Sequence, residues 1–122
     1  MKKTIMIKKN YEFKILFSKG KFYYGEFIHM YIKLTNQDIN KLGIAVSKKQ
    51  GKAVKRNHIK RLIRENYKNL ESRIKTGTNI LIVINKDKDI KDISFAQIEQ
   101  NFIRTLKKAD VLVDWYDKET MY

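Results

Sequence analysis

The stretch 48–64 combines eight cations with the apolar spacing of a helix and contains no acidic residue. Apolar side chains recur three or four positions apart, the period of one helix face, which predicts a helix over about 53–75. The predicted buried stripe consists of Val54, Ile59, Leu62, Ile63, Asn66, Tyr67, Leu70 and Ile74, and the cations are Lys48, Lys49, Lys52, Lys55, Arg56, Lys60, Arg61 and Arg64. Cations four residues apart repel each other, so this helix face suits a polyanion that relieves the repulsion.

The rest of the charge is unevenly distributed along the 122 residues. The net charge is +14, but residues 1–86 hold 21 basic and 5 acidic residues, whereas residues 87–122 hold 6 and 8. A compact domain is destabilised by such a field, which favours a nucleic acid as partner over a membrane or an acidic protein. The basic helix lacks the wide apolar face of a membrane-surface helix, and no segment is long enough to span a bilayer.

The remaining periodicity predicts an α+β fold in the order α-β-β-β-α-β-α, a sandwich of helices on a small sheet. A first helix runs over 10–18, with Asn10 as its cap and Gly20 just past its end. Strands follow over 21–34, broken at Gly25, and over 42–47, which makes three antiparallel strands plausible before the basic helix. The run I-L-I-V-I within 79–85 is typical of a central strand covered on both faces, and Ser94 with Gln97 caps a last helix to about residue 109.

Aromatic side chains gather beside cations in the first third of the chain. Phe13, Leu16 and Phe17 fall on one helix face, and Ile28, Met30, Ile32 and Leu34 alternate into a core. That alternation leaves a second strand face, which comprises Phe27, His29, Tyr31 and Lys33. Either the aromatics all belong to the core, or they form a platform on which unpaired bases stack. We favour the platform because the alternating aliphatic side chains already give this strand a core face.

The sequence shows no protein-borne active site. The two histidines have no acidic partner at ligand spacing, and Asp87, Asp89 and Asp92 alternate with lysines in what reads as a solvated turn, so we expect no metal site. With no cysteine there is no disulfide or thiol nucleophile, and no signal-peptide-like run opens the chain. We therefore expect a cytoplasmic location.

The sequence of the basic helix resembles that of a known protein family. Residues 51–65, G-K-A-V-K-R-N-H-I-K-R-L-I-R-E, preceded by S-K-K at 47–49, closely resemble the arginine-and-asparagine signature of the bacterial ribonuclease P protein component. Residues 7–20, with Phe13, Phe17 and Gly20, resemble the first helix of that family. The resemblance covers about residues 7–85 well and the last helix only by length and pattern, while Tyr11, Lys21, Phe22 and Tyr23 make the first turn unusually aromatic and basic.

The length of 122 residues predicts a single domain over 1–122, with ends at 1–6 and 115–122 that are expected to fray. The resemblance implies that this domain binds RNA and has a left-handed βαβ crossover like that of a ribosomal-protein domain. It implies a subunit of an endoribonuclease, which binds the ribonuclease P RNA and the 5′ leader of precursor tRNA and assists removal of the leader. The chemistry is expected from the RNA with Mg²⁺, and no protein oligomer is required. The resemblance assigns Lys52, Lys55, Arg56, Asn57, Lys60, Arg61 and Arg64 to the catalytic RNA, and Phe13, Phe17, Tyr31, Lys48 and Lys49 to a leader cleft.

Three other functions are weighed against this one. A ribosomal-type or single-strand RNA-binding protein would use the same cations without affecting cleavage. A stand-alone nuclease would need metal ligands on the protein. Such a protein would cleave RNA in the presence of magnesium without any RNA subunit. Reading of DNA by the basic helix in a major groove is disfavoured, because nothing in the sequence indicates a dimer or half-sites.

Overall fold

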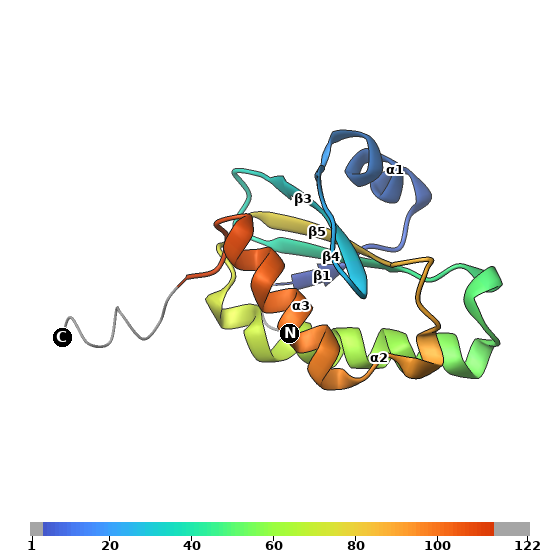
Figure 1. The fold of residues 1–122 in the computed structure, drawn as a ribbon. Helices are drawn as coiled ribbons and strands as arrows, with labels where there is room; N and C mark the ends of the chain where they lie inside the picture. The colour runs from blue at the N-terminus through green and yellow to red at the C-terminus, as the bar shows by residue number, and fades with distance from the viewer. Residues whose placement is uncertain (1–3, 114–122) are drawn as a thin grey trace.

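A computed structural model describes residues 4–113 as a five-stranded sheet with helices on both faces (Figure 1). The helices are α1 (Asn10–Lys19), α2 (Ala53–Leu70) and α3 (Phe95–Lys108), and the strands are β1 (Thr4–Met6), β2 (Lys21–Tyr23), β3 (Ile28–Leu34), β4 (Asn40–Ala45) and β5 (Thr78–Ile84), with short 3-10 turns at Lys48–Gln50, Glu71–Arg73 and Ile90–Asp92. The predicted α+β class and the order of its helices are confirmed. The expected fraying of residues 1–3 and 115–122 lies outside the described residues.

The strand order is β1-β4-β5-β3-β2. Of the three antiparallel strands predicted before the basic helix, β2 and β3 pair as expected, but β4 does not pair with β3. β5 lies between β3 and β4, antiparallel to the first and parallel to the second. Its apolar run needs cover on both faces, which only a central position provides. The parallel β4 and β5 are joined through α2, and this βαβ unit carries the basic helix from the sheet to its lower face (Figure 1).

An additional strand, β1, was not predicted, and its residues were assigned to the frayed end. Thr4–Met6 pairs in parallel with β4, and Thr4 Oγ1 lies 2.8 Å from the Tyr67 hydroxyl of α2. Tyr67 is buried, and burial raises the pKa of its phenol above the usual value. A three-residue strand is too short to show alternation, which explains why sequence reasoning missed it.

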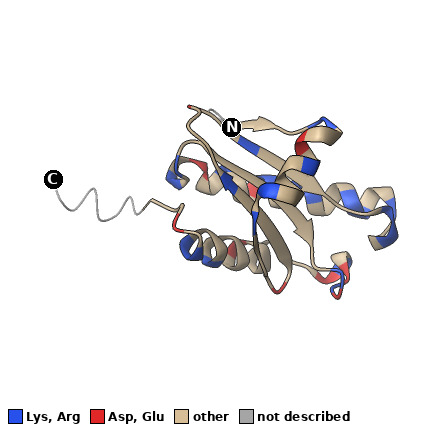
Figure 2. Ribbon diagram, turned by 90° about the horizontal axis from the view of Figure 1, so that it is seen from above, with Lys and Arg blue, Asp and Glu red and all other residues tan. Residues whose placement is uncertain are grey.

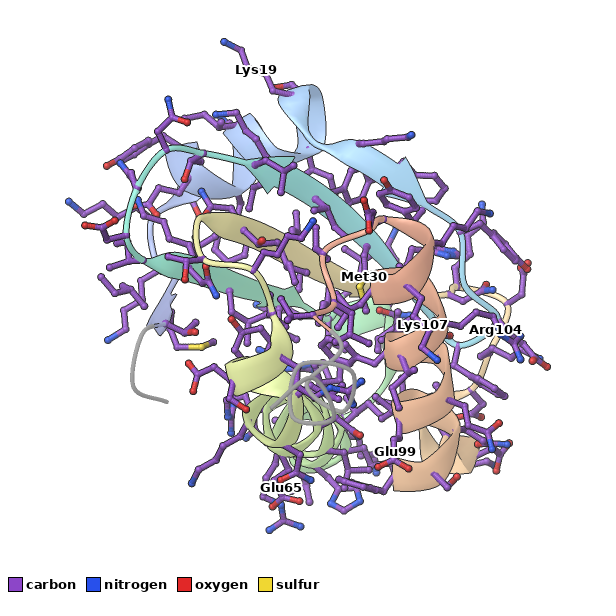
Figure 3. The ribbon with its side chains drawn as sticks, turned by 90° about the vertical axis from the view of Figure 1, so that its left-hand side faces the viewer. Lys19, Met30, Glu65, Glu99, Arg104 and Lys107 are labelled. Atoms are coloured by element: carbon purple, nitrogen blue, oxygen red, sulfur yellow. The ribbon has the colours of Figure 1, made fainter. Side chains whose placement is uncertain are left out.

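Two apolar clusters hold the layers together. The main core lies between the sheet and the helices α2 and α3, where Met30 points inward (Figure 3). It contains Ile28, Met30, Ile32, Leu42, Ile59, Ile63, Tyr67, Leu70, Ile80, Ile82, Ile98, Phe102 and Leu106, among others. The smaller cluster, Ile7, Leu16 and Leu81, lies under α1 on the opposite face. Because Leu81 and its neighbours in β5 point to different clusters, the prediction that this strand is covered on both faces is confirmed.

Several predicted details of the helices are wrong. Lys9, not Asn10, is the residue before α1, and no side chain caps it. Gly20 has a φ of −74°, so it is not a left-handed end residue; its small size matters because a Cβ there would lie 2.6 Å from the Leu16 carbonyl oxygen. α2 ends at Leu70 and a 3-10 turn follows, although Ile74 is buried as predicted.

The ends of two apolar patterns are also exposed. Leu34 is 64% exposed at the end of β3, and Val54 is 80% exposed in the first turn of α2. Both residues were predicted to be buried, and that prediction is wrong. Phe27 precedes β3 and packs against the main core instead of sharing the outer face with His29 and Tyr31. The Ser94–Gln97 capping box at α3 is confirmed, with both of its hydrogen bonds present.

Candidate nucleic-acid interface

The cations of α2 are displayed on its solvent side, next to the buried stripe. Figure 2 shows lysine and arginine recurring along α2 and the turn before it. Lys48, Lys49, Lys52, Lys55, Asn57, Arg61 and Arg64 are exposed, and Arg56 and Lys60 are half-buried. These nine residues are called the basic face below. The predicted separation of the basic face from the buried stripe, Ile59, Ile63 and Tyr67, is therefore present in the structure.

Little on the protein neutralises the basic face. Over residues 4–113, its one ion pair joins Arg61 Nε to Glu65 at 4.0 Å, and both side chains are more than half exposed. Such a pair contributes at most about 1 kcal/mol to stability and is screened by salt. Most of the positive charge on this face is therefore available to a phosphate backbone.

Arg56 differs from its neighbours because it also serves the fold. Its Nη1 donates a hydrogen bond of 2.6 Å to the Gly51 carbonyl oxygen, across the turn that leads into α2. A guanidinium carries five N–H donors, so this bond leaves others for a ligand. The structure thus gives Arg56 a structural contact that the sequence did not predict, in addition to its place on the basic face.

A cleft of about 510 Å³ lies between α1 and the end of β4. Its lining residues are Asn10, Phe13, Phe17, Ile44, Ala45, Val46, Ser47, Gln50, Lys60 and Val83. Gly43 lets α1 approach, since a Cβ there would lie 3.0 Å from Phe13 Cε1. The cleft therefore brings Phe13 and Phe17, which were predicted to contact the leader, together with Lys60, which was predicted to contact the catalytic RNA.

Tyr31 and the paired lysines surround this cleft without lining it. The Tyr31 ring contacts Phe17 edge to face at 4.9 Å and packs on the smaller cluster, so it holds Phe17 in place. Lys48 and Lys49 are exposed in the 3-10 turn that Ser47 caps. Because Ser47 lines the cleft and Lys48 follows it, the backbone of the two lysines continues from the rim of the cleft.

Sequence reasoning missed the polar part of the cleft, Ser47 and Gln50. Ser47 Oγ accepts from the Lys49 N–H, and Gln50 Oε1 accepts from the Ser47 N–H at 3.1 Å, which forms a capping box. The S-x-x-Q spacing in the sequence was a sufficient signal for that turn. Asn10, Val46 and Val83 carry no comparable signal, because only the tertiary fold brings them to one place.

The described residues contain no cluster of three or more histidine, cysteine or acidic side chains that could hold a metal ion. Asp89 serves the turn before α3: its Oδ1 accepts from the Lys91 N–H, and its other oxygen lies 3.8 Å from the Lys91 ammonium.

His29 lies on the α1 face of the sheet, where burial lowers the pKa of its imidazole and the charge of Asp87 partly opposes that effect. No helix within residues 4–113 is long and apolar enough to cross a membrane.

These features define a small basic α+β domain that presents a cationic helix beside an aromatic cleft. Comparisons with known proteins identify the family. The model of the family Ribonuclease P matches residues 1–110. The chain is 41% identical over 109 residues to the ribonuclease P protein component of Clostridium botulinum (strain Loch Maree / Type A3), covering 86% of this chain and 94% of that protein.

Other relatives agree. The ribonuclease P protein component of Clostridioides difficile (strain 630) is 32% identical over 112 residues, covering 91% of this chain and 96% of that protein. The solved structure of the Staphylococcus aureus RNase P protein has 37% identity and a TM-score of 0.77, covering 88% of this chain and 96% of that one. The Thermotoga maritima RNase P protein has 25% identity and a TM-score of 0.76, covering 85% and 96%. The chain belongs to the Ribonuclease P family and has the function of a ribonuclease P protein component.

Proposed function

We propose that the basic face of α2 binds the RNA subunit of ribonuclease P. Much of the charge on this face is unpaired: among its cations, Arg61 alone forms an ion pair within the described residues. Each ammonium or guanidinium that meets a phosphate releases counterions, which supplies affinity without reading sequence. Asn57, exposed among these cations, can donate and accept at a base edge or a 2′-hydroxyl.

The cleft between α1 and β4 then receives the unpaired 5′ leader of precursor tRNA. Phe17 is 46% exposed and Phe13 half-buried, so both rings have surface left for a base. Ser47 and Gln50 supply hydrogen-bonding groups, and Lys48, Lys49 and Lys60 supply charge. Single-stranded RNA is bound in general by this combination of aromatic rings and cations.

The cleavage chemistry is assigned to the RNA subunit with its Mg²⁺. The cleft is lined by apolar, amide, hydroxyl and ammonium groups, and neither a carboxylate nor an imidazole lines it. The protein there can position RNA, but the lining offers no conventional general base. Its cations add to the charge that screens RNA phosphates, which lowers the magnesium concentration that the RNA needs.

One observation carries this proposal: Lys60 belongs to the basic face and also lines the aromatic cleft. A leader in the cleft and the RNA subunit on α2 would therefore be neighbours. Cleavage at the junction between the leader and the tRNA requires this proximity. The test is to combine the chain with its cognate RNA subunit and to assay precursor tRNA cleavage at limiting magnesium. We expect faster cleavage, with a larger gain for leader-bearing than for leaderless substrates. A ribosomal-type RNA-binding protein would give no gain for either.

A further inference from the structure

A second aromatic surface lies on the sheet beside the cleft, on the hairpin that β2 and β3 form. In the pairing of these strands, Phe22 lies opposite Tyr31. Phe22 therefore points to the same face as Tyr31, which is the face covered by α1. α1 packs over Leu81 and close to Gly43, nearer the centre of the sheet, and the hairpin edge extends beyond it.

Five rings form a continuous row from the cleft to this edge. Phe17, which lines the cleft, contacts Tyr31 at 4.9 Å between ring centroids, and Tyr31 contacts Phe22 at 5.1 Å. The row continues from Phe22 to His29 at 5.3 Å and from His29 to Tyr24 at 4.9 Å. Phe22 is 48% exposed and Tyr24 is 68% exposed, so the outer half of the row faces solvent.

His29 joins the row to the floor of the cleft by a second route. In the antiparallel pairing of β3 and β5 it lies opposite Val83, which in turn lies opposite Ala45 in β4, and both of these residues line the cleft. The Gly25 N–H donates to His29 Nδ1 at 3.0 Å, which fixes the plane of the imidazole ring. The rings and the cleft thus share one uninterrupted strip of the sheet.

Packing of the core does not explain these rings. The core side of β3 is already supplied by Ile28, Met30 and Ile32, which are at most 5% exposed. A ring recruited for burial would be covered, whereas Phe22 and Tyr24 each leave about half or more of their surface in water. Large exposed apolar side chains that touch each other are typical of binding surfaces.

The charges around the row favour RNA over an apolar protein partner. Lys19 projects outward from the end of α1 (Figure 3), and Lys33, half-buried in β3, points to the same face as His29 and Tyr31. Lys21 points to the other face, where its ammonium lies over the Tyr23 ring at 5.4 Å. The acids near the row are Glu26, which is paired with Lys88 at 3.7 Å, and Asp87, whose charge acts on His29. Lys19 and Lys33 beside contacting aromatic rings match the combination found in single-strand binding surfaces.

We propose that Phe22, His29 and Tyr24 form a second base-stacking surface, here called the outer row, which binds unpaired nucleotides of the leader beyond those in the cleft. The inference rests on the proposed function, because the cleft must hold the leader for the outer row to receive its continuation. The row leads away from Lys60 and α2, so it meets nucleotides farther from the cleavage site. Affinity for substrate should therefore keep rising with leader length after the cleft is full.

The test measures affinity of the reconstituted holoenzyme for precursor tRNAs whose unstructured leaders lengthen one nucleotide at a time. The combined substitution Phe22→Ala and Tyr24→Ala should lower affinity about fivefold or more for long leaders and leave short leaders unchanged, as expected when a base loses its aromatic stacking partner. A second variant with Leu at both positions keeps apolar packing without a π face, and should show the same loss. The control is Tyr11→Ala, an exposed aromatic on α1 outside the row.

The outcomes separate the two proposals. If wild type gains affinity with leader length and both outer-row variants match it at every length, the outer row does not bind RNA, while the cleft proposal stands. If the Ala variant loses affinity but the Leu variant does not, the loss comes from packing and the inference is overturned. If leader length has no effect on wild type, the cleft proposal itself fails. A loss confined to long leaders in both variants supports the outer row.

Discussion

Lys60 and Phe17 line one cleft although their helices pack on opposite faces of the sheet. α2 follows β4 after the short 3-10 turn Lys48–Gln50, and the cleft opens where β4 ends, so the first turns of α2 reach the edge of the face that α1 covers. A cation from the proposed RNA-docking helix thus meets an aromatic ring from the proposed leader cleft. The predictions below test the two sides of this junction separately.

Removing charge from the basic face should weaken RNA-subunit binding and reduce its salt dependence. For Arg61→Ala or Arg64→Ala, we expect the log–log slope of affinity against salt to fall by about 0.7–0.9 for each phosphate that is no longer neutralised. The measurement is a titration of RNA binding over a range of salt concentrations. Lys107→Ala removes an equal charge from the exposed side of α3 (Figure 3) and should change neither quantity appreciably. Equal slopes for all variants would mean that the basic face does not meet phosphate.

Arg56→Ala should have two effects where Arg61→Ala has one. Losing the bond from Arg56 Nη1 to the Gly51 carbonyl should lower the free energy of unfolding by about 1–2 kcal/mol, since the donor is charged and half-buried. Arg61 has a long ion pair with Glu65 and a contact of Nη2 with His58 Nδ1 at 3.1 Å, both exposed, so its removal should change stability by less than about 1 kcal/mol. Urea denaturation measures both. Identical stabilities would show that the bond from Arg56 to Gly51 contributes nothing to the fold.

Phe17→Ala should discriminate between substrates. The ring is nearly half exposed, so the fold loses little, but a leader base loses its stacking partner. We expect the holoenzyme's affinity for leader-bearing precursor to fall by about 1–3 kcal/mol, with no change for a leaderless one. The competing interpretation, in which Phe17 is simply part of the core, predicts an equal loss for both substrates together with a lower free energy of unfolding.

Asn101→Leu tests how the hairpin is attached to α3. The buried amide accepts from the N–H groups of Phe27 and Ile28 and donates to the Ile28 carbonyl. Leucine leaves these backbone groups without partners, so we expect a loss of about 2–4 kcal/mol in unfolding free energy. Gln100→Leu, at the neighbouring exposed position, is the control and should be close to neutral. A stable Asn101 variant would show that water or a shift of the strand replaces the amide.

His29 should make stability depend on pH in a predictable direction. Burial lowers the pKa of its imidazole in the folded protein below the ordinary value of 6.5, so on acidification the unfolded chain takes up this proton first. The folded protein favours the neutral imidazole of His29. The free energy of unfolding should therefore fall as the pH drops through 6.5 toward the lower pKa of the folded state. His29→Asn keeps an acceptor for the Gly25 N–H without a titrating group, and should flatten the unfolding free energy over that range. A profile as steep as wild type would exclude His29 as the cause.

Local patterns predicted the elements that have long, unambiguous periods. α2 and α3 were placed to within a few residues because their apolar residues recur at helical spacing, and β5 was placed in the centre because its apolar run cannot face water. The same patterns did not reveal that β5 separates β3 from β4, since alternation says which face a strand buries but not which strand lies beside it.

The site shows the same division. The basic face follows from the sequence, because all its residues lie on or next to one helix and helical geometry fixes their mutual directions. The cleft does not, because Phe17, Val83 and Lys60 come from three elements and meet only in the tertiary fold. The resemblance to a known family was needed to link the aromatic side chains with the cations of the basic helix. The sequence placed His29 on the possible stacking platform and marked Phe22 as an unusual aromatic, but it did not join them with Tyr24 into one row, because Phe22 and Tyr24 belong to a three-residue strand and the segment after it.

The most direct test of the junction between basic face and cleft uses a tethered probe. The chain has no cysteine, so a single introduced cysteine can carry an iron chelate that cleaves nearby RNA by hydroxyl radicals. Asn57→Cys on the basic face should cut the RNA subunit, Ser18→Cys beside Phe17 should cut the leader of bound precursor tRNA, and Lys107→Cys on α3 should give only background. Cleavage of neither RNA above that background from positions 57 and 18 would contradict the account.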